Sequence, residues 1–378
     1  MGIEPDTAQR ALMIYIEPTP YVLALIRRVV SCADAPVDVL FITANVSQHW
    51  NLSLEGMPAG YLPRGTAVAC REIAKRLSSA RYGIVHLAGW GHPVLLGAML
   101  MARLRGVPVA VETDTVLPVA QQWLKRIAKK FLYPTMLGLP AVFLPGGTRQ
   151  KRYLQHYGVA ERRIVVAQMT VDVVGIASSV MAISPETRHA QRVAMGIAPD
   201  ECAFLFVGRL EAVKGIAGLL EAFAQVSAPG ANVRLLIVGD GMLRGVVEMA
   251  QAESGRVRWM GRMTGDSLLN VYAAADVFVL PSLFEPWGLV VNEAMAAGLP
   301  VIATDRVGCV DDLVVDGETG IVIDADRPSA LAEAMRRLAN DAPLRHAMGA
   351  AARQRIAGWT IEAEAEIVVG AWRQAMRA

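Results

Sequence analysis

Short apolar runs rich in β-branched residues alternate with longer segments of helical periodicity along most of this chain. In the first half, such runs cover residues 11–16, 37–43, 83–87, 107–112, 141–144 and 164–167. Residues 172–200 contain no clear strand, and the alternation then resumes at residues 202–207, 235–238, 257–260, 277–280, 301–303 and 320–323. This alternation is typical of a parallel sheet covered by helices. The sequence therefore predicts an α/β fold with two doubly wound domains and a boundary near residues 173–198.

Length and composition agree with two buried cores. At 378 residues, the chain exceeds the size of about 250 to 300 residues at which a single core usually stops growing. Hydrophobic residues make up 53% of it and charged residues 19%, which argues against disorder. The cysteines lack the paired spacing of a zinc site, and the first residues do not resemble a signal peptide. These cysteines are Cys32, Cys70, Cys202 and Cys309. We therefore expect a cytoplasmic protein without a metal centre.

Two classes of protein are disfavoured by the distribution of charge. The most apolar window, residues 93–111, is interrupted by Arg103, Arg105 and Gly106, whereas a spanning helix needs about 18 consecutive apolar residues. The net charge is only +2, and the chain has no long run of Lys and Arg. The sequence thus argues against a membrane-spanning helix and against nucleic-acid binding.

The first candidate binding loop follows the predicted strand that ends at Val207. Open α/β sheets bind ligands at the carboxyl ends of their strands, so this loop is well placed for a ligand. It contains Gly208 and Arg209, and Lys214 follows before the next helix. A guanidinium and an ammonium there would grip one diphosphate from two sides. The alternative is a solvated loop whose two basic residues bind nothing.

The second candidate loop follows the predicted strand that ends at Leu280. It carries Glu285 and Glu293, eight positions apart, with Gly288 between them. Because Gly288 has no Cβ, the backbone there can approach a ligand closely, and the next helix presents free N–H groups to phosphate or sugar oxygens. Together these features suit a ligand with both hydroxyls and phosphates. Alternatively, Glu293 is an ordinary acidic residue favoured by the dipole of a helix start.

These residues carry a family resemblance. Glu285 to Glu293 matches the E-x7-E motif of retaining glycosyltransferases, and Arg209 with Lys214 matches their paired basic motif. Further matches lie at residues 238–241, 297–302 and 316–320, so the chain resembles glycosyltransferase family 4 most densely over residues 202–325. The resemblance implies the GT-B fold, in which two Rossmann-like domains face a central cleft. Residues 1–178 would form the acceptor domain, completed by a C-terminal helix at 361–378, and residues 179–360 the donor domain.

The resemblance also implies a role for individual residues. The enzyme would be retaining, would use a nucleotide sugar as its donor, and would need no metal ion or other cofactor. Catalysis would involve Glu285, Arg209, Lys214 and His92. The donor would be bound by Gly208, Arg209, Lys214, Trp259, Met260, Glu285, Gly288, Leu289, Val290 and Glu293.

Within the donor set, the implied contacts differ. Arg209 and Lys214 would hold the diphosphate, Glu293 the ribose hydroxyls and Glu285 the hydroxyls of the transferred sugar. Retention without an enzyme-bound sugar requires stabilisation of the leaving phosphate while the acceptor attacks the same face, and fixed positive charge supplies it. Trp259 would border the nucleobase, although it is equally interpreted as a core aromatic residue.

The N-terminal half resembles the family more loosely, mainly its exopolysaccharide and lipid-linked-oligosaccharide enzymes. His92 would contact the reacting sugar or the acceptor, and Asp114 would orient the acceptor hydroxyl. A histidine in a glycine-rich loop is also often a simple turn residue, and His86, within an apolar strand, is expected to be a core histidine. Two departures concern residues 17–21, where many relatives carry a Gly-Gly loop, and residues 169–172, where only part of the usual linker motif is present.

The segment from Gln121 to Tyr133 predicts an amphipathic helix with a basic face. Such a helix can lie in an anionic membrane surface, and the alternative is a domain helix with a solvated basic face. The resemblance favours a glycan or lipid-linked acceptor, in exopolysaccharide assembly, with the enzyme peripheral on the inner face of the cytoplasmic membrane. Two alternatives remain open, a GT-B sugar-nucleotide epimerase and a non-catalytic protein that binds nucleotide sugars.

Overall fold

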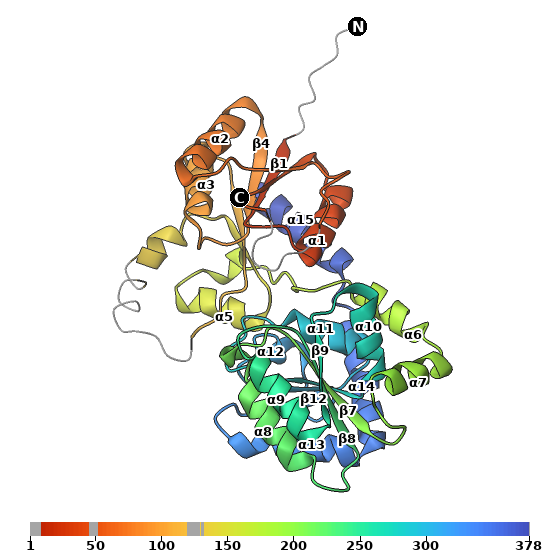
Figure 1. Ribbon diagram of the computed structural model, residues 1–378. Coiled ribbons are helices and arrows are strands. Elements are labelled where there is room, and N and C mark those ends of the chain that lie inside the picture. Colours follow the sequence, from red (N-terminus) through yellow and green to blue (C-terminus); the bar gives the residue numbers. More distant parts are fainter. Residues whose placement is uncertain (1–8, 45–51, 119–128, 130–131, 378) are drawn as a thin grey trace. The chain divides into compact units, whose positions relative to one another are not determined.

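The computed structural model describes residues 9–44, 52–118, 129 and 132–377. The chain forms two compact units (Figure 1). Unit 1 contains Met1–Met169 together with Ile361–Ala378, and unit 2 is Thr170–Thr360. The expected boundary at residues 178 and 179 falls inside helix α6 (Val173–Met181), which packs against helices α10 and α11 of unit 2. The chain therefore leaves unit 1 nine residues earlier than the sequence predicts.

Unit 1 is a parallel sheet with helices on both sides. Its described strands are ordered β3-β2-β1-β4-β5-β6, and in the central strand Met13 pairs with Val39 on one side and His86 on the other. The strands are β1 (Arg10–Tyr15), β2 (Val37–Phe41), β3 (Ala59–Tyr61), β4 (Tyr82–Leu87), β5 (Val109–Thr113) and β6 (Val142–Pro145). The helices are α1 (Pro20–Cys32), α2 (Thr66–Ser79), α3 (Pro93–Leu104), α5 (Thr148–His156) and α15 (Ile361–Arg377), with a 3-10 turn η1 (Glu161–Arg163).

Unit 2 repeats this architecture with the described strand order β12-β11-β10-β7-β8-β9. Its strands are β7 (Cys202–Val207), β8 (Val233–Val238), β9 (Val257–Gly261), β10 (Val277–Leu280), β11 (Val301–Thr304) and β12 (Gly320–Ile323). Besides α6, its helices are α7 (Pro185–Ala194), α8 (Ile216–Val226), α9 (Arg244–Ser254), α10 (Gly265–Ala274), α11 (Leu289–Ala296), α12 (Val310–Leu313), α13 (Pro328–Asn340) and α14 (Ala342–Ile356), with a 3-10 turn η2 (Ala212–Lys214).

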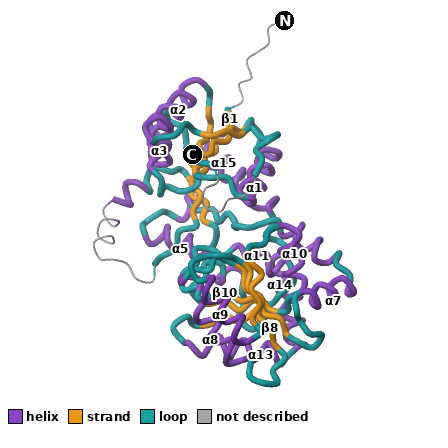
Figure 2. Tube along the Cα trace, viewed as in Figure 1, coloured by secondary structure: helices purple, strands orange, loops and turns teal. Residues whose placement is uncertain are grey.

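Local sequence explains why these elements form where they do. In α1, Thr19 caps the first turn by accepting a hydrogen bond from the Val22 amide, and Pro20 has the fixed φ that a helix start needs. Strand β7 is buried at every position, as expected for a strand covered by helices on both faces. In each unit the strands lie inside a layer of helices (Figure 2). The predicted fold class is therefore confirmed.

The strands of unit 2 match the six runs predicted from the sequence, but unit 1 differs at two places. The expected strand at residues 164–167 is wrong, because Ile164 alone forms an isolated bridge, with Phe143. The Val165 and Ala167 amides still donate to carbonyls of β6, so this segment follows the sheet edge without forming a ladder. Strand β3 was not predicted, because it has only three residues, none of them β-branched and none fully buried.

Helix α15 closes unit 1 with residues from the end of the chain. Val368, Val369 and Trp372 are buried in the same core cluster as residues of β1 and β2. The guanidinium of Arg373 also donates two hydrogen bonds to Asp34, at 2.6 and 2.9 Å. The two ends of the sequence therefore build one sheet-and-helix layer.

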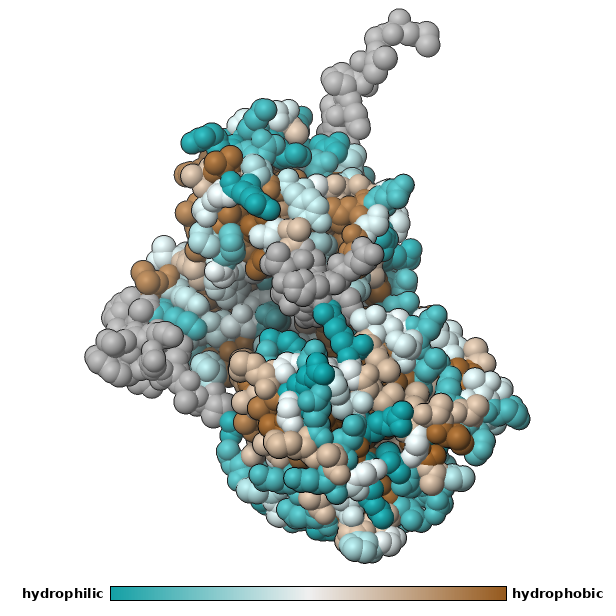
Figure 3. Space-filling view, in the orientation of Figure 1, coloured by the Kyte–Doolittle hydropathy of each residue, from teal (hydrophilic) through white to brown (hydrophobic). Residues whose placement is uncertain are grey.

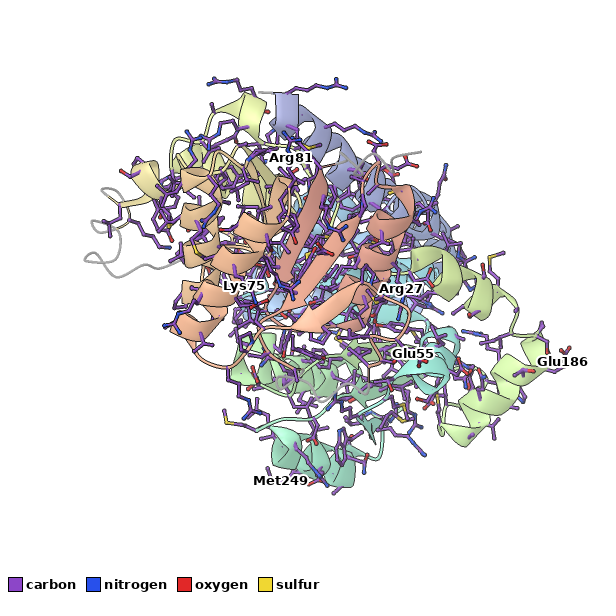
Figure 4. The ribbon with its side chains drawn as sticks, turned by 90° about the horizontal axis from the view of Figure 1, so that it is seen from above. Arg27, Glu55, Lys75, Arg81, Glu186 and Met249 are labelled. Carbon is purple, nitrogen blue, oxygen red and sulfur yellow. The ribbon has the colours of Figure 1, made fainter. Side chains whose placement is uncertain are left out.

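The surface mixes polar and apolar residues. Charged side chains such as Arg27 of α1 and Lys75 of α2 point away from the sheet (Figure 4). The visible face in Figure 3 shows no continuous apolar band, and the most exposed large apolar residues belong to separate elements, such as Leu104 in α3 and Met242 in a loop. Among the helices of the described residues, none is both long enough and apolar enough to cross a membrane.

Candidate active site

The two loops predicted to bind a ligand in unit 2 follow neighbouring strands. Strands β7 and β10 lie side by side at the point where the strand order reverses, since the chain builds β8 and β9 on one side and β10, β11 and β12 on the other. Open α/β sheets bind ligands at the carboxyl ends of the strands that flank such a reversal. The topology thus brings the loop at residues 208–215 to the loop at residues 281–288.

Two glycines allow the loops of unit 2 to pack closely. Gly215 has φ +72°, and a Cβ there would lie 2.1 Å from the carbonyl oxygen of Pro281. Gly239, after β8, has φ +139°, and its Cβ would lie 1.8 Å from the carbonyl oxygen of Gly208. The Leu283 amide also donates to the carbonyl of Val213 at 2.8 Å. No other residue would fit these positions without moving the loops apart.

Lys214 and Glu285 form an ion pair at this junction. Lys214 Nζ donates to Glu285 Oε2, and each side chain keeps only 13% of its exposure. The backbone of Glu285 is held as well, because its amide donates to the Arg306 carbonyl at 3.3 Å and its carbonyl accepts from Gly308 at 2.8 Å. The structure therefore brings together two residues that are 71 positions apart in the sequence.

Arg209 lies further out on the same loop. Its side chain is 62% exposed and contacts Glu211 Oε1 at 2.7 Å. Both cations predicted to hold a diphosphate are thus paired with carboxylates. An anionic ligand would have to compete with these carboxylates, and competition is easier at the exposed pair, where water screens the charges.

Helix α11 begins directly after the second loop. Its N-cap is Gly288, with φ +100°, and no described group accepts a hydrogen bond from the Leu289 or Val290 amides. The orientation of this helix is fixed by Trp287, which is buried, donates to Asn292 Oδ1 at 3.1 Å and stacks on Trp359 with ring centroids 5.7 Å apart. Free first-turn amides and the positive end of the dipole suit an anion or a sugar oxygen.

Glu293 is a half-buried carboxylate in the second turn of α11. Tyr272 of α10 donates a hydrogen bond to Glu293 Oε2 at 2.7 Å. Burial raises the pKa of Glu293, and the hydrogen bond from Tyr272 opposes that rise. The pKa of Tyr272 is raised well above its usual value, first by burial and then by the Glu293 charge, so the phenol stays a donor. One oxygen of Glu293 is therefore anchored within the protein.

Trp259 of β9 is held by the loop after β8 and by the first residue of helix α9. Its indole N–H donates to the Gly239 carbonyl at 2.8 Å, and the guanidinium of Arg244 lies 4.3 Å from the ring centroid. The ring and its neighbour Met260 are both half-buried. The indole N–H is consequently occupied by the backbone, and only its ring surface can contact a ligand.

The candidate residues of unit 1 follow β4 and β5. His92 is the N-cap of α3, and its Nδ1 accepts a hydrogen bond from the Val94 amide at 3.2 Å. His92 therefore has the turn role that was one of its two interpretations, which leaves its Nε2 for another contact. Asp114 follows β5 on the exposed side of the loop. Most of the segment between Gln121 and Tyr133 lies outside the described residues.

A buried polar cluster in unit 1 was only partly foreseen. His86 is fully buried, as expected of a core histidine, and lies between Trp372 Nε1, 2.9 Å from His86 Nδ1, and Glu112 Oε1, 2.9 Å from His86 Nε2. Tyr15 donates to the same oxygen of Glu112 at 3.1 Å. A glutamate that ends an otherwise apolar strand is the sequence signal for this cluster.

The described residues contain no group of three or more His, Cys, Asp or Glu arranged to hold a metal ion.

Comparison with known proteins agrees with this geometry. Residues 187–355 match the family described as glycosyl transferases group 1. A D-inositol 3-phosphate glycosyltransferase of Rhodococcus erythropolis is 30% identical over 377 residues, covering 92% of this chain and 81% of the relative. The chain belongs to the group 1 glycosyltransferases. A relative of the same name from Corynebacterium diphtheriae is 35% identical over 209 residues, covering 52% of this chain and 49% of that protein.

Solved structures show that this group 1 glycosyltransferase has the GT-B type of fold. A glycosyltransferase from Rickettsia africae superposes with a TM-score of 0.79 at 15% identity, covering 98% of this chain and 99% of that one. HepE from Anabaena, in complex with UDP and glucose, gives 0.75 at 17% identity, covering 97% and 100%. The relatives named above are D-inositol 3-phosphate enzymes, so the exopolysaccharide setting stays a prediction for this glycosyltransferase.

Proposed function

We propose that this glycosyltransferase transfers a sugar, with retention of configuration, from a nucleotide-sugar donor bound to unit 2. The observation that carries the proposal is the contact between Lys214 and Glu285 at the strand-order reversal, next to the N-terminus of α11. A cation for phosphates, a carboxylate for hydroxyls and free helix amides occur there together. A nucleotide sugar is the ligand class that needs all three.

The positive groups would hold the diphosphate. Lys214 would exchange Glu285 for a phosphate oxygen, Arg209 would exchange Glu211, and the Leu289 and Val290 amides would donate to the same group. HepE, which has the same fold, has been solved with UDP and glucose. As the bond between the anomeric carbon and the phosphate oxygen breaks, negative charge grows on the departing diphosphate. Fixed cations and helix amides then lower the barrier, and we propose that no metal ion or other cofactor takes part.

The carboxylates would hold the hydroxyls of the donor. Glu293, whose Oε2 is anchored by Tyr272, would accept hydrogen bonds from the ribose hydroxyls. Glu285, once released by Lys214, would accept from hydroxyls of the transferred sugar. The acceptor oxygen would form its bond to the anomeric carbon on the face that the diphosphate leaves, and its proton would pass to the departing phosphate. Trp259 and Met260 would border the base.

The acceptor is a hydroxyl compound, and we assign its binding to unit 1. The relatives are named D-inositol 3-phosphate glycosyltransferases. We therefore add a polyol to the candidate acceptors, beside the glycan or lipid-linked acceptor expected from the sequence. Contact with a membrane through residues 121–133 remains a prediction, because that segment lies largely outside the described residues.

A donor screen tests the proposal. UDP-, GDP- and ADP-sugars are added to the wild type, to Lys214→Met, and to Lys214→Met combined with Glu285→Gln, which avoids leaving a half-buried Glu285 unpaired. Thermal stabilisation and donor hydrolysis are then measured. One base class should stabilise the wild type, and both variants should bind it about 10- to 100-fold more weakly, since a charge-assisted contact is lost.

The matched control is Lys75→Met, which removes an exposed lysine of α2 in unit 1 (Figure 4) and should bind like the wild type. If no donor stabilises the wild type, the proposed function fails. Donor binding without hydrolysis or transfer would favour a non-catalytic protein, and conversion of the donor to an epimer would favour the epimerase alternative.

A further inference from the structure

The cluster of Tyr15, His86, Glu112 and Trp372 lies at the strand-order reversal of unit 1. Tyr15 ends β1, His86 lies in β4 and Glu112 is the penultimate residue of β5, and the order β3-β2-β1-β4-β5-β6 reverses between β1 and β4. Helix α15, which carries Trp372, packs against β4, β5 and β6. The carboxyl ends of β1, β4 and β5 thus meet at the edge where an α/β sheet binds ligands.

The donor and acceptor roles of the His86 ring nitrogens follow from their partners. The indole N–H of Trp372 is only a donor, so His86 Nδ1, 2.9 Å away, must accept. A neutral imidazole then carries its proton on Nε2, which donates to Glu112 Oε1 at 2.9 Å. The helix at the end of the chain therefore sets the tautomer of a histidine in the sheet.

Tyr15 adds a second donor to the same oxygen. Its hydroxyl lies 3.1 Å from Glu112 Oε1. The pKa of Tyr15 is raised well above its usual value, first by burial and then by the charge of Glu112, so the phenol keeps its proton. Two buried donors thus fix Oε1 of Glu112, and with it the plane of the carboxylate.

The other oxygen of Glu112 is differently placed. Within the described residues, Oε2 accepts no hydrogen bond, and the side chain keeps 21% of its exposure. A carboxylate accepts hydrogen bonds and donates none. Glu112 therefore presents one rigidly held acceptor oxygen at the ligand-binding edge of unit 1.

Carboxylates lie near Tyr21 as well. The pKa of Tyr21 is raised first by burial. A hydrogen bond with Thr19 lowers it, and the charges of Asp114, Glu17 and Glu112 raise it. A hydroxyl fits the position beside Glu112, because it can donate a hydrogen bond to Oε2, which only accepts.

We propose that Glu112 Oε2 accepts a hydrogen bond from a hydroxyl of the acceptor, which is a polyol or a sugar, and that His86 is a positioning residue for that carboxylate. The inference rests on the proposed function and extends it to the acceptor. It places a hydroxyl-bearing part of the acceptor at the end of β5.

The geometry supplies a sharp variant, Glu112→Gln. Because Tyr15 and the Nε2–H of His86 both donate, the glutamine must turn its oxygen toward them and its NH2 group outward. We therefore expect the variant to fold like the wild type, with a donor in place of the free acceptor oxygen. An acceptor hydroxyl would then have to accept a hydrogen bond from the amide. Its lone pair would point toward the amide and away from the anomeric carbon of the donor sugar. The matched control is Glu72→Gln on α2, where the carboxylate pairs only with Arg76 in the described residues.

The assay measures transfer from the donor that the screen of nucleotide sugars selects. The acceptors are myo-inositol, methyl α-D-mannopyranoside and D-inositol 3-phosphate. We expect Glu112→Gln to lower kcat/KM for transfer about 10- to 100-fold, the loss of one charge-assisted hydrogen bond, with donor affinity and donor hydrolysis unchanged. Transfer within twofold of wild type, or a wild type that uses none of the three probes, would overturn the inference. If the wild type bound no donor at all, that result would instead count against the proposed function.

His86 is tested through Trp372→Phe, which keeps an aromatic ring but removes the N–H that sets the tautomer. The acceptor KM should rise about fivefold or more while the donor KM stays constant, as expected when one hydrogen bond of about 1 kcal/mol no longer aligns the carboxylate. A purely structural role would lower the melting temperature and the active fraction without changing the acceptor KM, and that result would remove His86 from the proposal.

Discussion

Three carboxylates of the candidate sites are held by chemically different partners. Glu285 is paired with the ammonium of Lys214, Glu293 accepts from the phenol of Tyr272, and Glu112 accepts from His86 and Tyr15. A charged partner is exchanged easily for a phosphate, whereas a neutral buried donor keeps its place. Glu285 is thus suited to change partner on binding, and the other two are suited to stay fixed.

Glu293→Gln should stabilise the protein and weaken donor binding. Because burial raises the Glu293 pKa above its ordinary value of 4.5, the stability it contributes is present below that pH and is lost as pH rises through the folded-state pKa. The melting temperature of the variant should therefore exceed that of the wild type increasingly from about pH 4 to pH 7. Donor affinity should fall about tenfold, since a charge-assisted hydrogen bond becomes neutral.

Thermal denaturation across this pH range and calorimetric titration of the donor check both effects. Glu186→Gln in α7 is the control, because the Ser184 hydroxyl lowers the pKa of Glu186 and the sign of the pH dependence is reversed. A stability difference that does not depend on pH would show that Glu293 does not titrate as described.

His92 allows its capping role to be separated from catalysis. His92→Asn keeps an acceptor for the Val94 amide and should retain stability, whereas His92→Ala should lose about 1 kcal/mol, the usual contribution of an N-cap. Both variants lack the Nε2 group implied to contact the reacting sugar or acceptor, so transfer should fall about tenfold in each. Chemical denaturation and transfer kinetics measure the two effects. Normal transfer by His92→Asn would leave His92 with the cap alone.

At the level of elements, the start of α8 shows how a helix is attached to the candidate site. Gly215 ends η2 and caps α8 in a left-handed conformation that brings the backbone against Pro281. A helix start with a side chain at this position would force the loops after β7 and β10 apart. Lys214 and Glu285 would then separate, since each lies on one of these loops.

Two alanine variants of neighbouring glycines test this account. Gly215→Ala should lose about 1 to 3 kcal/mol of unfolding free energy, because its Cβ would overlap the Pro281 carbonyl and its φ is +72°. Gly218→Ala, in an exposed helical turn with no atom within 4 Å of the added Cβ, should gain about 0.5 to 1 kcal/mol. Urea denaturation compares them. Equal effects of the two substitutions would contradict the close approach of the loops.

Over the whole molecule, each unit has its own core, although the chain passes from one to the other twice. Unit 1 requires α15 from the far end of the sequence, and unit 2 is continuous from Thr170 to Thr360. A destabilising substitution in α15 should therefore lower the stability of strands that precede it by more than 200 residues. Its effect on the stability of unit 2 should be small.

Trp372→Ala tests this separation. Removing a buried tryptophan should destabilise unit 1 by about 3 to 5 kcal/mol, through lost burial and the cavity that remains. Hydrogen exchange should become faster in β1, β4 and β5, while the strands of unit 2 keep their protection. Mass spectrometry of the exchanged peptides measures this, and equal loss of protection in both units would mean that they unfold as one.

The amino-acid sequence by itself determined the two α/β series, every strand of unit 2, and the loops that carry Arg209, Lys214, Glu285 and Glu293. These features follow from apolar patterns and spacings within single segments. A strand that helices cover on both faces must itself be apolar, so its own residues reveal it. Segment patterns failed at residues 164–167, where an apolar run lies beside β6 without completing a ladder.

Only the tertiary structure decided which side chains meet. Lys214 pairs with Glu285 across 71 residues because β7 and β10 are neighbours at a reversal of strand order. Trp372 meets His86 across 286 residues because α15 returns to unit 1, and this contact fixes the tautomer that holds Glu112. A hydrophobic pattern belongs to one segment, whereas a hydrogen bond between distant segments depends on strand order and helix docking, which no local pattern specifies.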